Sequence, residues 1–124
     1  MIMNANKKYG FATKQIHAGN KPDPTGALCT PIYQTSTFRF SSVEQGGARF
    51  AGQEEGYIYS RLGNPSLTTL EDKVAALENG EACLATASGM GAISSAIWSS
   101  VVAGDNIVAS DTLYGCTYAL LNHG

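Results

Sequence analysis

The second half of the chain alternates short apolar runs with stretches of helical spacing, and this alternation constrains the fold most strongly. Residues 82–87 and 106–110 are short, largely apolar runs that we predict to be buried strands. A helical stretch follows each run, from residue 88 to about 102 and from 113 to 121. The order strand, helix, strand, helix predicts a parallel sheet with right-handed crossovers, whose ligand sites lie beyond the carboxyl ends of the strands.

One further helix is predicted before this alternation. Asn64 can cap its amino terminus, Pro65 suits its first position, and Asn79-Gly80 ends it. Its apolar residues recur at helical spacing, at Leu67, Leu70, Val74 and Leu77. Two strands are too few to cover the apolar faces of these helices, so we expect residues 64–124 to be the beginning of a larger domain.

Residues 1–63 have a different character, because glycine and proline punctuate them and no helical period is sustained. Irregular segments of this length are uncommon inside compact domains and often pack against a second subunit. A disordered tail is the alternative. It would leave several large apolar side chains in water, namely Ile32, Phe38, Phe40, Phe50, Tyr57 and Ile58. We therefore predict an extended arm that contacts a neighbouring subunit.

Composition and charge argue against several classes of protein. The 124 residues are 44% hydrophobic and 15% charged, which is typical of a folded domain and not of a disordered tail. A formal net charge of -2 provides no broad positive field for nucleic acid, although a local phosphate site stays compatible with it. We therefore expect no nucleic-acid partner.

No segment is expected to span a membrane or to direct secretion. The longest weakly polar stretch, residues 92–104, contains four serines. It is shorter than the roughly 20 apolar residues of a membrane span. Residues 1–11 lack the apolar run of a secretory signal. A cytoplasmic location is therefore predicted.

The cysteines and histidines do not form a recognisable metal motif. Cys29, Cys83 and Cys116 are odd in number and too widely spaced for a CxxC knuckle, which favours free thiols in a reducing compartment. The two histidines, His17 and His123, are isolated in sequence. We expect no metal site.

A candidate phosphate site lies where the first predicted strand passes into its helix. Ser88, Gly89 and Met90 begin that helix, so its first amides point toward one spot, and Gly89 lets an anion approach the backbone. An ordinary N-cap serine followed by flexible glycines explains the same residues. Spacing alone favours this plainer interpretation, because the segment is neither a P-loop nor GxGxxG.

Two aromatic residues mark further candidate positions. Tyr59 and Arg61 stand two apart in an extended-looking segment, so their side chains project from one face, and the guanidinium matches phosphate geometry. Tyr114 follows the second predicted strand at the same sheet edge as Gly89, where its ring could stack on a flat cofactor. Alone, each is more often a packed tyrosine or a surface arginine, and Cys116 is by default a small buried side chain.

The combination of these segments resembles the Cys/Met-metabolism pyridoxal-phosphate enzymes over nearly the whole chain. The resemblance is carried by residues 59–65 (YSRLGNP), 87–90 (ASGM), 113–117 (LYGCT), 16–19 (IHAG) and 30–38 (TPIYQTSTF). It implies an α/β type I aminotransferase-like fold. Residues 1–63 would be the extended arm that reaches a neighbouring subunit, and residues 64–124 would be the start of the pyridoxal-phosphate-binding domain.

The resemblance also implies roles for individual residues. Gly89 and Met90 would bind the cofactor phosphate through their amides, with Ser88 as a further cofactor-binding residue. Tyr59 and Arg61 would bind the phosphate held by the partner chain, in a homo-oligomer that is typically a tetramer with active sites shared between subunits. Tyr114 would stack on the cofactor ring and, with Cys116, would contact the substrate and take part in catalysis.

Position 116 separates branches of this family. Members that act on methionine resemble Tyr-Gly-Cys-Thr here, as in Cys116, whereas cystathionine lyases and homoserine-ester sulfhydrylases usually show Tyr-Gly-Gly-Thr. The resemblance therefore implies α,γ-elimination of L-methionine, or of a related sulfur amino acid, to methanethiol, 2-oxobutanoate and ammonia. Tyr114 would be the general acid for the departing sulfur, and acting also as a base would require its pKa to be lowered from about 10 by nearby cationic groups. The reactions of cystathionine gamma-lyase, cystathionine gamma-synthase and O-acetylhomoserine sulfhydrylase stay as alternatives.

The residue that such enzymes use to hold the cofactor covalently, a Schiff-base lysine, has no counterpart in these motifs. The lysines of residues 1–63 belong to the arm, and Lys73 flanks the apolar face of a helix. We therefore predict that these 124 residues alone are inactive. A non-catalytic oligomerisation module is the second alternative.

Overall fold

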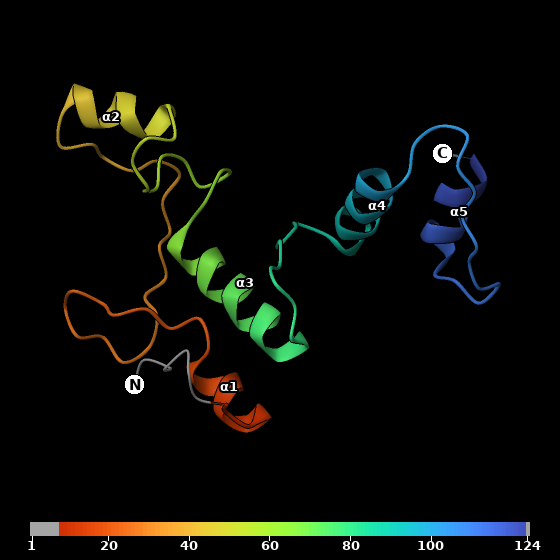
Figure 1. Cartoon of the computed structure of the whole chain (residues 1–124), viewed down its shortest axis with the longest axis horizontal. Helices are drawn as coiled ribbons and strands as arrows, with labels where there is room; N and C mark the ends of the chain where they lie inside the picture. Colours follow the sequence, from red (N-terminus) through yellow and green to blue (C-terminus); the bar gives the residue numbers. More distant parts are fainter. Residues whose placement is uncertain (1–7, 124) are drawn as a thin grey trace. The chain divides into compact units, whose positions relative to one another are not determined.

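The computed structural model describes residues 8–123, which contain five helices (Figure 1). They are α1 (Phe11–His17), α2 (Val43–Phe50), α3 (Pro65–Glu78), α4 (Gly89–Ser100) and α5 (Gly115–His123). The chain divides into two compact units, Met1–Leu84 and Ala85–Gly124, which we call the first and the second unit. Residues 1–11, for which no secretory signal was expected, lie partly outside the described residues, which begin at Lys8.

Helix α3 forms the centre of the first unit and agrees with the helix predicted from the sequence. The Asn64 side chain accepts a hydrogen bond from the amide of Ser66 at 2.9 Å, and Pro65 occupies the first turn. The helix ends at Asn79, which adopts the left-handed conformation with φ 55°. Both ends of α3 are therefore set by local sequence signals.

Helix α1 packs against α3 through a small buried contact. Ala18 is 3% exposed, and the Lys14 ammonium donates to the Ala76 carbonyl at 2.8 Å and to Asn79 Oδ1 at 2.9 Å. These acceptors lie at the carboxyl end of α3, where a cation is stabilised by the exposed carbonyls. Lys73 returns a bond of 3.4 Å to the carbonyl of Ile16. Reciprocal lysine contacts thus join the two helices.

Helix α2 is held by its own caps and by aromatic packing. Ser42 accepts from the amide of Gln45 at 3.2 Å, and Gln45 in turn accepts from the amide of Ser41 at 2.8 Å. The Phe40 ring packs edge-on against Phe50 with centroids 6.1 Å apart. Helices α1 and α2 lie within residues 1–63, where the sequence shows no sustained helical period, because segments of seven or eight residues are too short to show one.

Two extended segments of the first unit lie side by side as a short antiparallel ladder. Thr37 and Tyr59 form an isolated bridge. The amide of Phe38 donates to Ile58 at 3.1 Å, and the amide of Ser60 donates to Ser36 at 2.8 Å. The Phe38 ring also contacts Tyr57, with centroids 5.3 Å apart. We call residues 57–64 the phosphate strip, because they include Tyr59 and Arg61, for which phosphate binding was predicted.

The second unit consists of α4 and α5, which pack against each other. Ser88 caps α4 by accepting from the amide of Gly91 at 3.0 Å. The strands predicted at residues 82–87 and 106–110 are not formed within the described residues, and this corrects that part of the prediction. A buried parallel strand requires neighbouring strands to satisfy its backbone groups, and neither segment has such a neighbour here.

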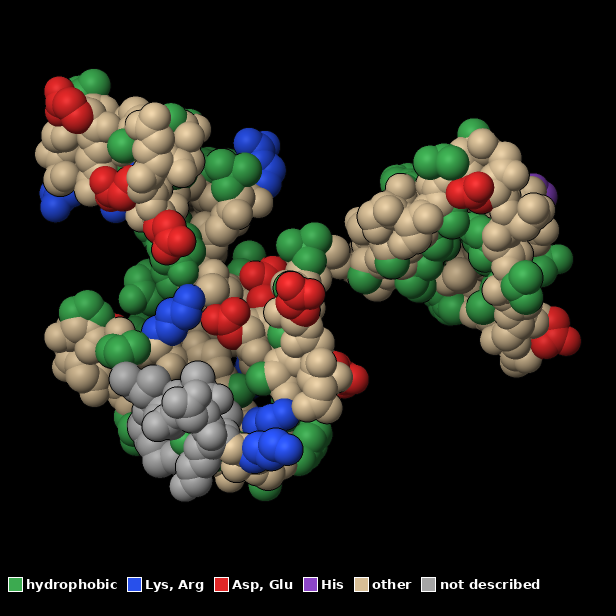
Figure 2. Space-filling model, in the orientation of Figure 1, with side chains coloured by type: hydrophobic (Ala, Val, Ile, Leu, Met, Phe, Trp, Pro, Cys, Tyr) green, Lys and Arg blue, Asp and Glu red, His purple; other side chains and the backbone are tan. Residues whose placement is uncertain are grey.

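Large apolar side chains lie on the surface of both units (Figure 2). Among described residues, the buried hydrophobic core is limited to Ala18 and Ala75, whereas Leu70 is 50% exposed and Trp98 is 71% exposed. The uncovered helix faces agree with a sheet domain of which only the first elements are present. The three cysteines are free thiols. Among residues 8–123, no helix has the length and apolar character that crossing a membrane requires.

Candidate functional site

The amino terminus of α4 offers two backbone donors that have no acceptor in the described part of the chain. Ser88 Oγ accepts a hydrogen bond from the amide of Gly91, and the Ser88 carbonyl accepts one from the amide of Ala92 at 3.1 Å. The amides of Gly89 and Met90 stay unpaired. A Cβ added at Gly89 would have no atom within 4 Å, so the backbone is open to a ligand on that side. Free amides together with the helix dipole bind an anion well.

The start of α5 lies beside the start of α4. Thr117 is 8% exposed, and its hydroxyl donates to the sulfur of Met90 at 3.8 Å. This contact joins the first turns of the two helices and brings the segment containing Tyr114 and Cys116 toward the phosphate candidates. Thr117 belongs to the motif of residues 113–117, but the sequence predicted no contact for it.

Cys116 affects the titration of Tyr114, which lies two positions before it. Tyr114 is 68% exposed. The Cys116 side chain raises the pKa of Tyr114 above its ordinary value, first by hydrogen bonding and then by Coulombic interaction. The phenol therefore releases its proton less readily than an ordinary tyrosine does. The lowering of the pKa that a base would need does not come from Cys116.

Tyr59 and Arg61 lie together at the end of the ladder in the first unit. The Arg61 guanidinium lies over the Tyr59 ring, 5.1 Å from its centroid. Within residues 8–123 Arg61 makes no ion pair, so its donors are available to an anion. Arg49 differs, because it is bonded to Glu54 at 3.1 Å and to the Tyr57 carbonyl at 3.3 Å. Arg49 is therefore bonded to the first residue of the phosphate strip, whereas Arg61 has no ion-pair partner among residues 8–123.

Asn64 and Ser60 tie the phosphate strip to residues 33–36. Asn64 Nδ2 donates to the Tyr33 carbonyl at 2.9 Å and to Ser60 Oγ at 3.0 Å. The Ser60 hydroxyl donates in turn to the carbonyl of Thr35. The sequence predicted only the capping role of Asn64. Its second role depends on residues 31 positions away, which no local pattern reveals.

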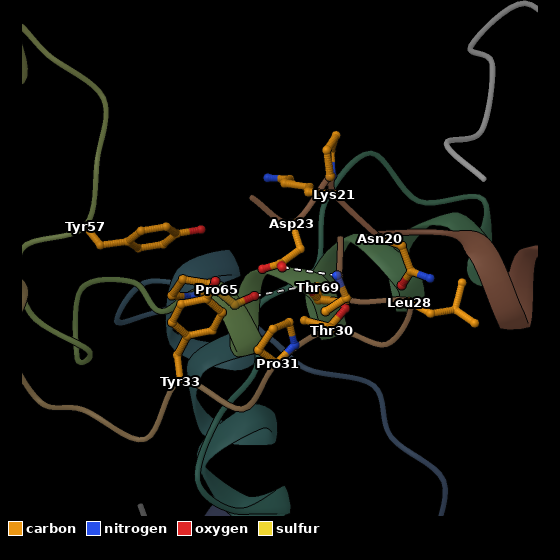
Figure 3. A pocket seen from close by; sticks show the side chains of 12 residues that line it. Asn20, Lys21, Asp23, Leu28, Thr30, Pro31, Tyr33, Tyr57, Pro65 and Thr69 are labelled. Carbon is orange, nitrogen blue, oxygen red and sulfur yellow. Dashed lines mark hydrogen bonds between the residues drawn. The ribbon is translucent and has the colours of Figure 1, made fainter. Parts of the chain in front are cut away.

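A small cavity of about 70 Å³ lies elsewhere in the first unit, between the loop of residues 20–31 and α3 (Figure 3). Its charged side chains are already engaged. Asp23 accepts from the amide of Ala27 at 3.2 Å, and Lys21 pairs with Asp72 at 3.6 Å. A hydrogen bond from Thr25 lowers the pKa of Asp23. None of the predicted site residues lines this cavity.

The predicted residues thus form two groups, each within one unit. Ser88, Gly89 and Met90 meet the first turn of α5 in the second unit, and Tyr59 lies against Arg61 in the first unit. The free amides at a helix terminus in one unit and an arginine without an ion-pair partner among the described residues in the other are groups that can bind an anion.

The chain belongs to the family of Cys/Met metabolism PLP-dependent enzymes, whose model matches residues 12–124. It is similar to the L-methionine gamma-lyase of Treponema denticola, with 67% identity over 95% of the chain and 29% of that protein. The homocysteine synthase of Schizosaccharomyces pombe is 47% identical over 89% of the chain and 26% of its own length. The chain therefore spans less than a third of the curated relatives that it matches.

Solved structures show the same relationship. A candidate O-acetylhomoserine (thiol)-lyase of Campylobacter jejuni superposes with a TM-score of 0.84 at 35% identity, covering 94% of this chain and 29% of that one. That structure contains N'-pyridoxyl-lysine-5'-monophosphate at position 205. The cystathionine gamma-lyase of Lactobacillus plantarum, complexed with L-serine, gives a TM-score of 0.75 at 39% identity, covering 92% and 28%. These matches confirm the predicted fold class and family.

Proposed function

We propose that the full-length protein containing this chain is a pyridoxal-phosphate-dependent carbon–sulfur lyase. It would convert L-methionine to methanethiol, 2-oxobutanoate and ammonia by α,γ-elimination. The observation that carries this proposal is the similarity to L-methionine gamma-lyases, which reaches 67% identity over 118 residues. Cys116 supports the same substrate.

The geometry of the second unit fits the phosphate of the cofactor. The unpaired amides of Gly89 and Met90 would hold it, and Ser88 keeps those amides exposed by capping the helix one residue further on, at Gly91. Arg61 and Tyr59 would complete the phosphate site of a neighbouring chain, because the arginine has no ion-pair partner among the described residues. We infer from this a homo-oligomer, and propose a tetramer.

When bound, the cofactor would supply an electron sink for the carbanions formed at the substrate. Tyr114 would donate a proton to the departing sulfur. Cys116, whose side chain raises the pKa of Tyr114, would contact the substrate. A cytoplasmic location also remains our proposal.

The substrate test gives the purified full-length protein methionine, cystathionine and O-acetylhomoserine in separate assays. We expect methanethiol from methionine. Similarity to a homocysteine synthase keeps the sulfhydrylase reaction as an alternative. Turnover of another substrate without release of methanethiol from methionine would refute the choice of substrate while leaving the cofactor proposal intact.

A non-catalytic oligomerisation module is the other candidate, because large apolar side chains are exposed on both units. Colour separates the two functions. A yellow protein whose colour is removed by borohydride carries the covalently held cofactor. A colourless protein that cannot be loaded with pyridoxal phosphate would support the module.

The sharing of active sites between subunits can be tested by mixing two inactive variants. Arg61→Ala damages the phosphate site given to the neighbour, and Tyr114→Phe damages the site of its own chain. Re-assembled mixtures should regain activity if the two residues serve different chains, since some sites then receive both intact residues. Arg39→Ala, at another exposed arginine of the first unit, is the control that should retain activity alone. No recovery from the mixture would refute the shared site.

A further inference from the structure

The turn that carries Arg61 is held by a limited set of hydrogen bonds. The amides of Leu62 and Gly63 both donate to the Tyr59 carbonyl, at 2.8 and 3.1 Å. The guanidinium itself is exposed and contacts only the Tyr59 ring among the interactions found for it in residues 8–123. The position of Arg61 therefore depends on how firmly the backbone of the turn is anchored.

Asn64 closes this turn and is 6% exposed, whereas the other residues of the strip are half-buried or exposed. Its amide nitrogen uses both protons, toward the Tyr33 carbonyl at 2.9 Å and toward Ser60 Oγ at 3.0 Å. The Ser60 hydroxyl in turn donates a hydrogen bond to the carbonyl of Thr35. The side chains of Asn64 and Ser60 thus join both ends of the turn to residues 33–35, in addition to the backbone bond from Ser60 to Ser36.

Capping α3 does not require this amide. The cap uses only Asn64 Oδ1, which accepts from Ser66, and aspartate or serine would serve the helix equally well. Only an amide side chain of this length supplies an acceptor for the cap together with two N–H donors. The donors are therefore a second requirement at this position, separate from helix initiation.

We propose that Asn64 is a positioning residue for the phosphate site, acting through Ser60 and the Tyr33 backbone to hold the Tyr59–Arg61 pair. The ligand served is the phosphate monoester of pyridoxal phosphate bound to a neighbouring chain. This inference rests on the proposed function and assigns to it a residue that touches neither cofactor nor substrate.

The test measures phosphate preference in the full-length protein. The apoprotein is titrated with pyridoxal phosphate and with pyridoxal, and the preference is the ratio of the two dissociation constants. Asn64→Ser keeps an oxygen that can cap α3 but removes both N–H donors and adds no charge. Asn64→Asp keeps the cap and the side-chain shape but replaces the donors with a charged oxygen. Both should lower the preference about three- to tenfold, as expected for a lost buried hydrogen bond. Ser60→Ala should lower it in the same direction.

A merely structural role would weaken the binding of both ligands together and leave their ratio unchanged. The matched control is Asn20→Asp, which makes the same exchange at an exposed amide that also donates to a carbonyl, that of Ile16 at 3.1 Å. It should keep the wild-type ratio. A reduced ratio in Asn64→Asp alone would assign the effect to the added charge and overturn the proposal.

Arg61→Ala separates this inference from the proposed function. It should lower the preference by about tenfold or more, because a hydrogen bond to a charged group is lost. If it does so while Asn64→Ser keeps the wild-type ratio, the positioning role is refuted and the phosphate role of the strip stands. If Arg61→Ala also keeps the wild-type ratio, the phosphate role falls and the positioning role with it.

Discussion

In our proposal the phosphate strip of one chain and the start of α4 in a neighbouring chain bind the same cofactor phosphate. The two parts are nevertheless built differently. Residues distant in sequence hold the strip: Asn64 bonds to Tyr33, and Ser60 to Ser36. The terminus of α4 is instead set by Ser88 and Gly91, three positions apart. In the strip, the orientation of the Arg61 side chain depends on surrounding contacts. At the helix terminus, the geometry of the helix itself orients the backbone N–H donors.

This difference shows why the two parts respond differently to mutation. Changes in the first unit should act through contacts between separate segments, so their effects should spread from the altered residue to α1 and α3. Changes at the second unit should stay within the first turns of α4 and α5. The following predictions use the full-length protein, with local stability measured by native-state hydrogen exchange.

The largest effect is expected from Gly19→Ala, at the junction of α1 and α3. Gly19 has φ 74°, and a Cβ there would collide with the Thr69 carbonyl oxygen and lie 3.1 Å from the amide of Lys73. We expect the opening free energy of the α1–α3 contact to fall by about 3 kcal/mol.

Gly26→Ala is the matched control for this substitution. Gly26 has a similar φ of 78°, but a Cβ there would meet no atom within 4 Å. Only the backbone strain should remain, with a loss of about 1 kcal/mol. Equal losses in the two variants would show that the collision at Gly19 contributes nothing.

Lys14→Met should have the next largest effect. It removes charged hydrogen bonds to the Ala76 carbonyl and to Asn79 at the end of α3, so α1 should lose about 1.5 kcal/mol of local stability. Lys21→Met removes an exposed ion pair with Asp72 at 3.6 Å and should change stability by less than about 0.5 kcal/mol. A larger loss from the Lys21 variant would contradict this ranking.

Ser88→Ala tests the locality of the second unit. Loss of the cap on Gly91 should destabilise α4 by about 1 kcal/mol and should leave hydrogen exchange in α3 unchanged. Ser99→Ala is the control in the same helix. The Ser99 hydroxyl donates to the Ala96 carbonyl at 3.1 Å without capping anything, so its loss should be close to neutral. Altered exchange in α3 would refute the locality.

The smallest effect concerns pH and follows from the raised pKa of Tyr114. The folded chain holds this proton more tightly than the unfolded chain, so the associated stability is present below the ordinary phenol pKa of about 10 and is lost as pH rises through the folded value. Cys116→Ala removes the hydrogen bond and the charge and should return the pKa downward. The change is measured by titrating phenolate absorbance against a Tyr114→Phe reference, and an unchanged titration would exclude Cys116 as the cause.

Part of the fold and site could be predicted because it depends on neighbouring residues. Asn64 and Pro65 predicted the start of α3, and Ser88 predicted the start of α4. Helices α1 and α2 escaped prediction because their length is too short for a period to show. The strands at 82–87 and 106–110 were predicted from apolar character alone, which cannot supply the neighbours that a strand needs.

The sequence by itself determined the caps and bounds of α3 and α4, the free amides after Ser88, and the motifs that place the chain in its family, because each depends on residues a few positions apart. Only the tertiary structure decided that α1 docks on α3 through Lys14, that Thr117 meets Met90, and that Asn64 anchors the turn before it. These contacts join residues far apart in the chain, so they exist only once the backbone has brought their partners within hydrogen-bonding distance.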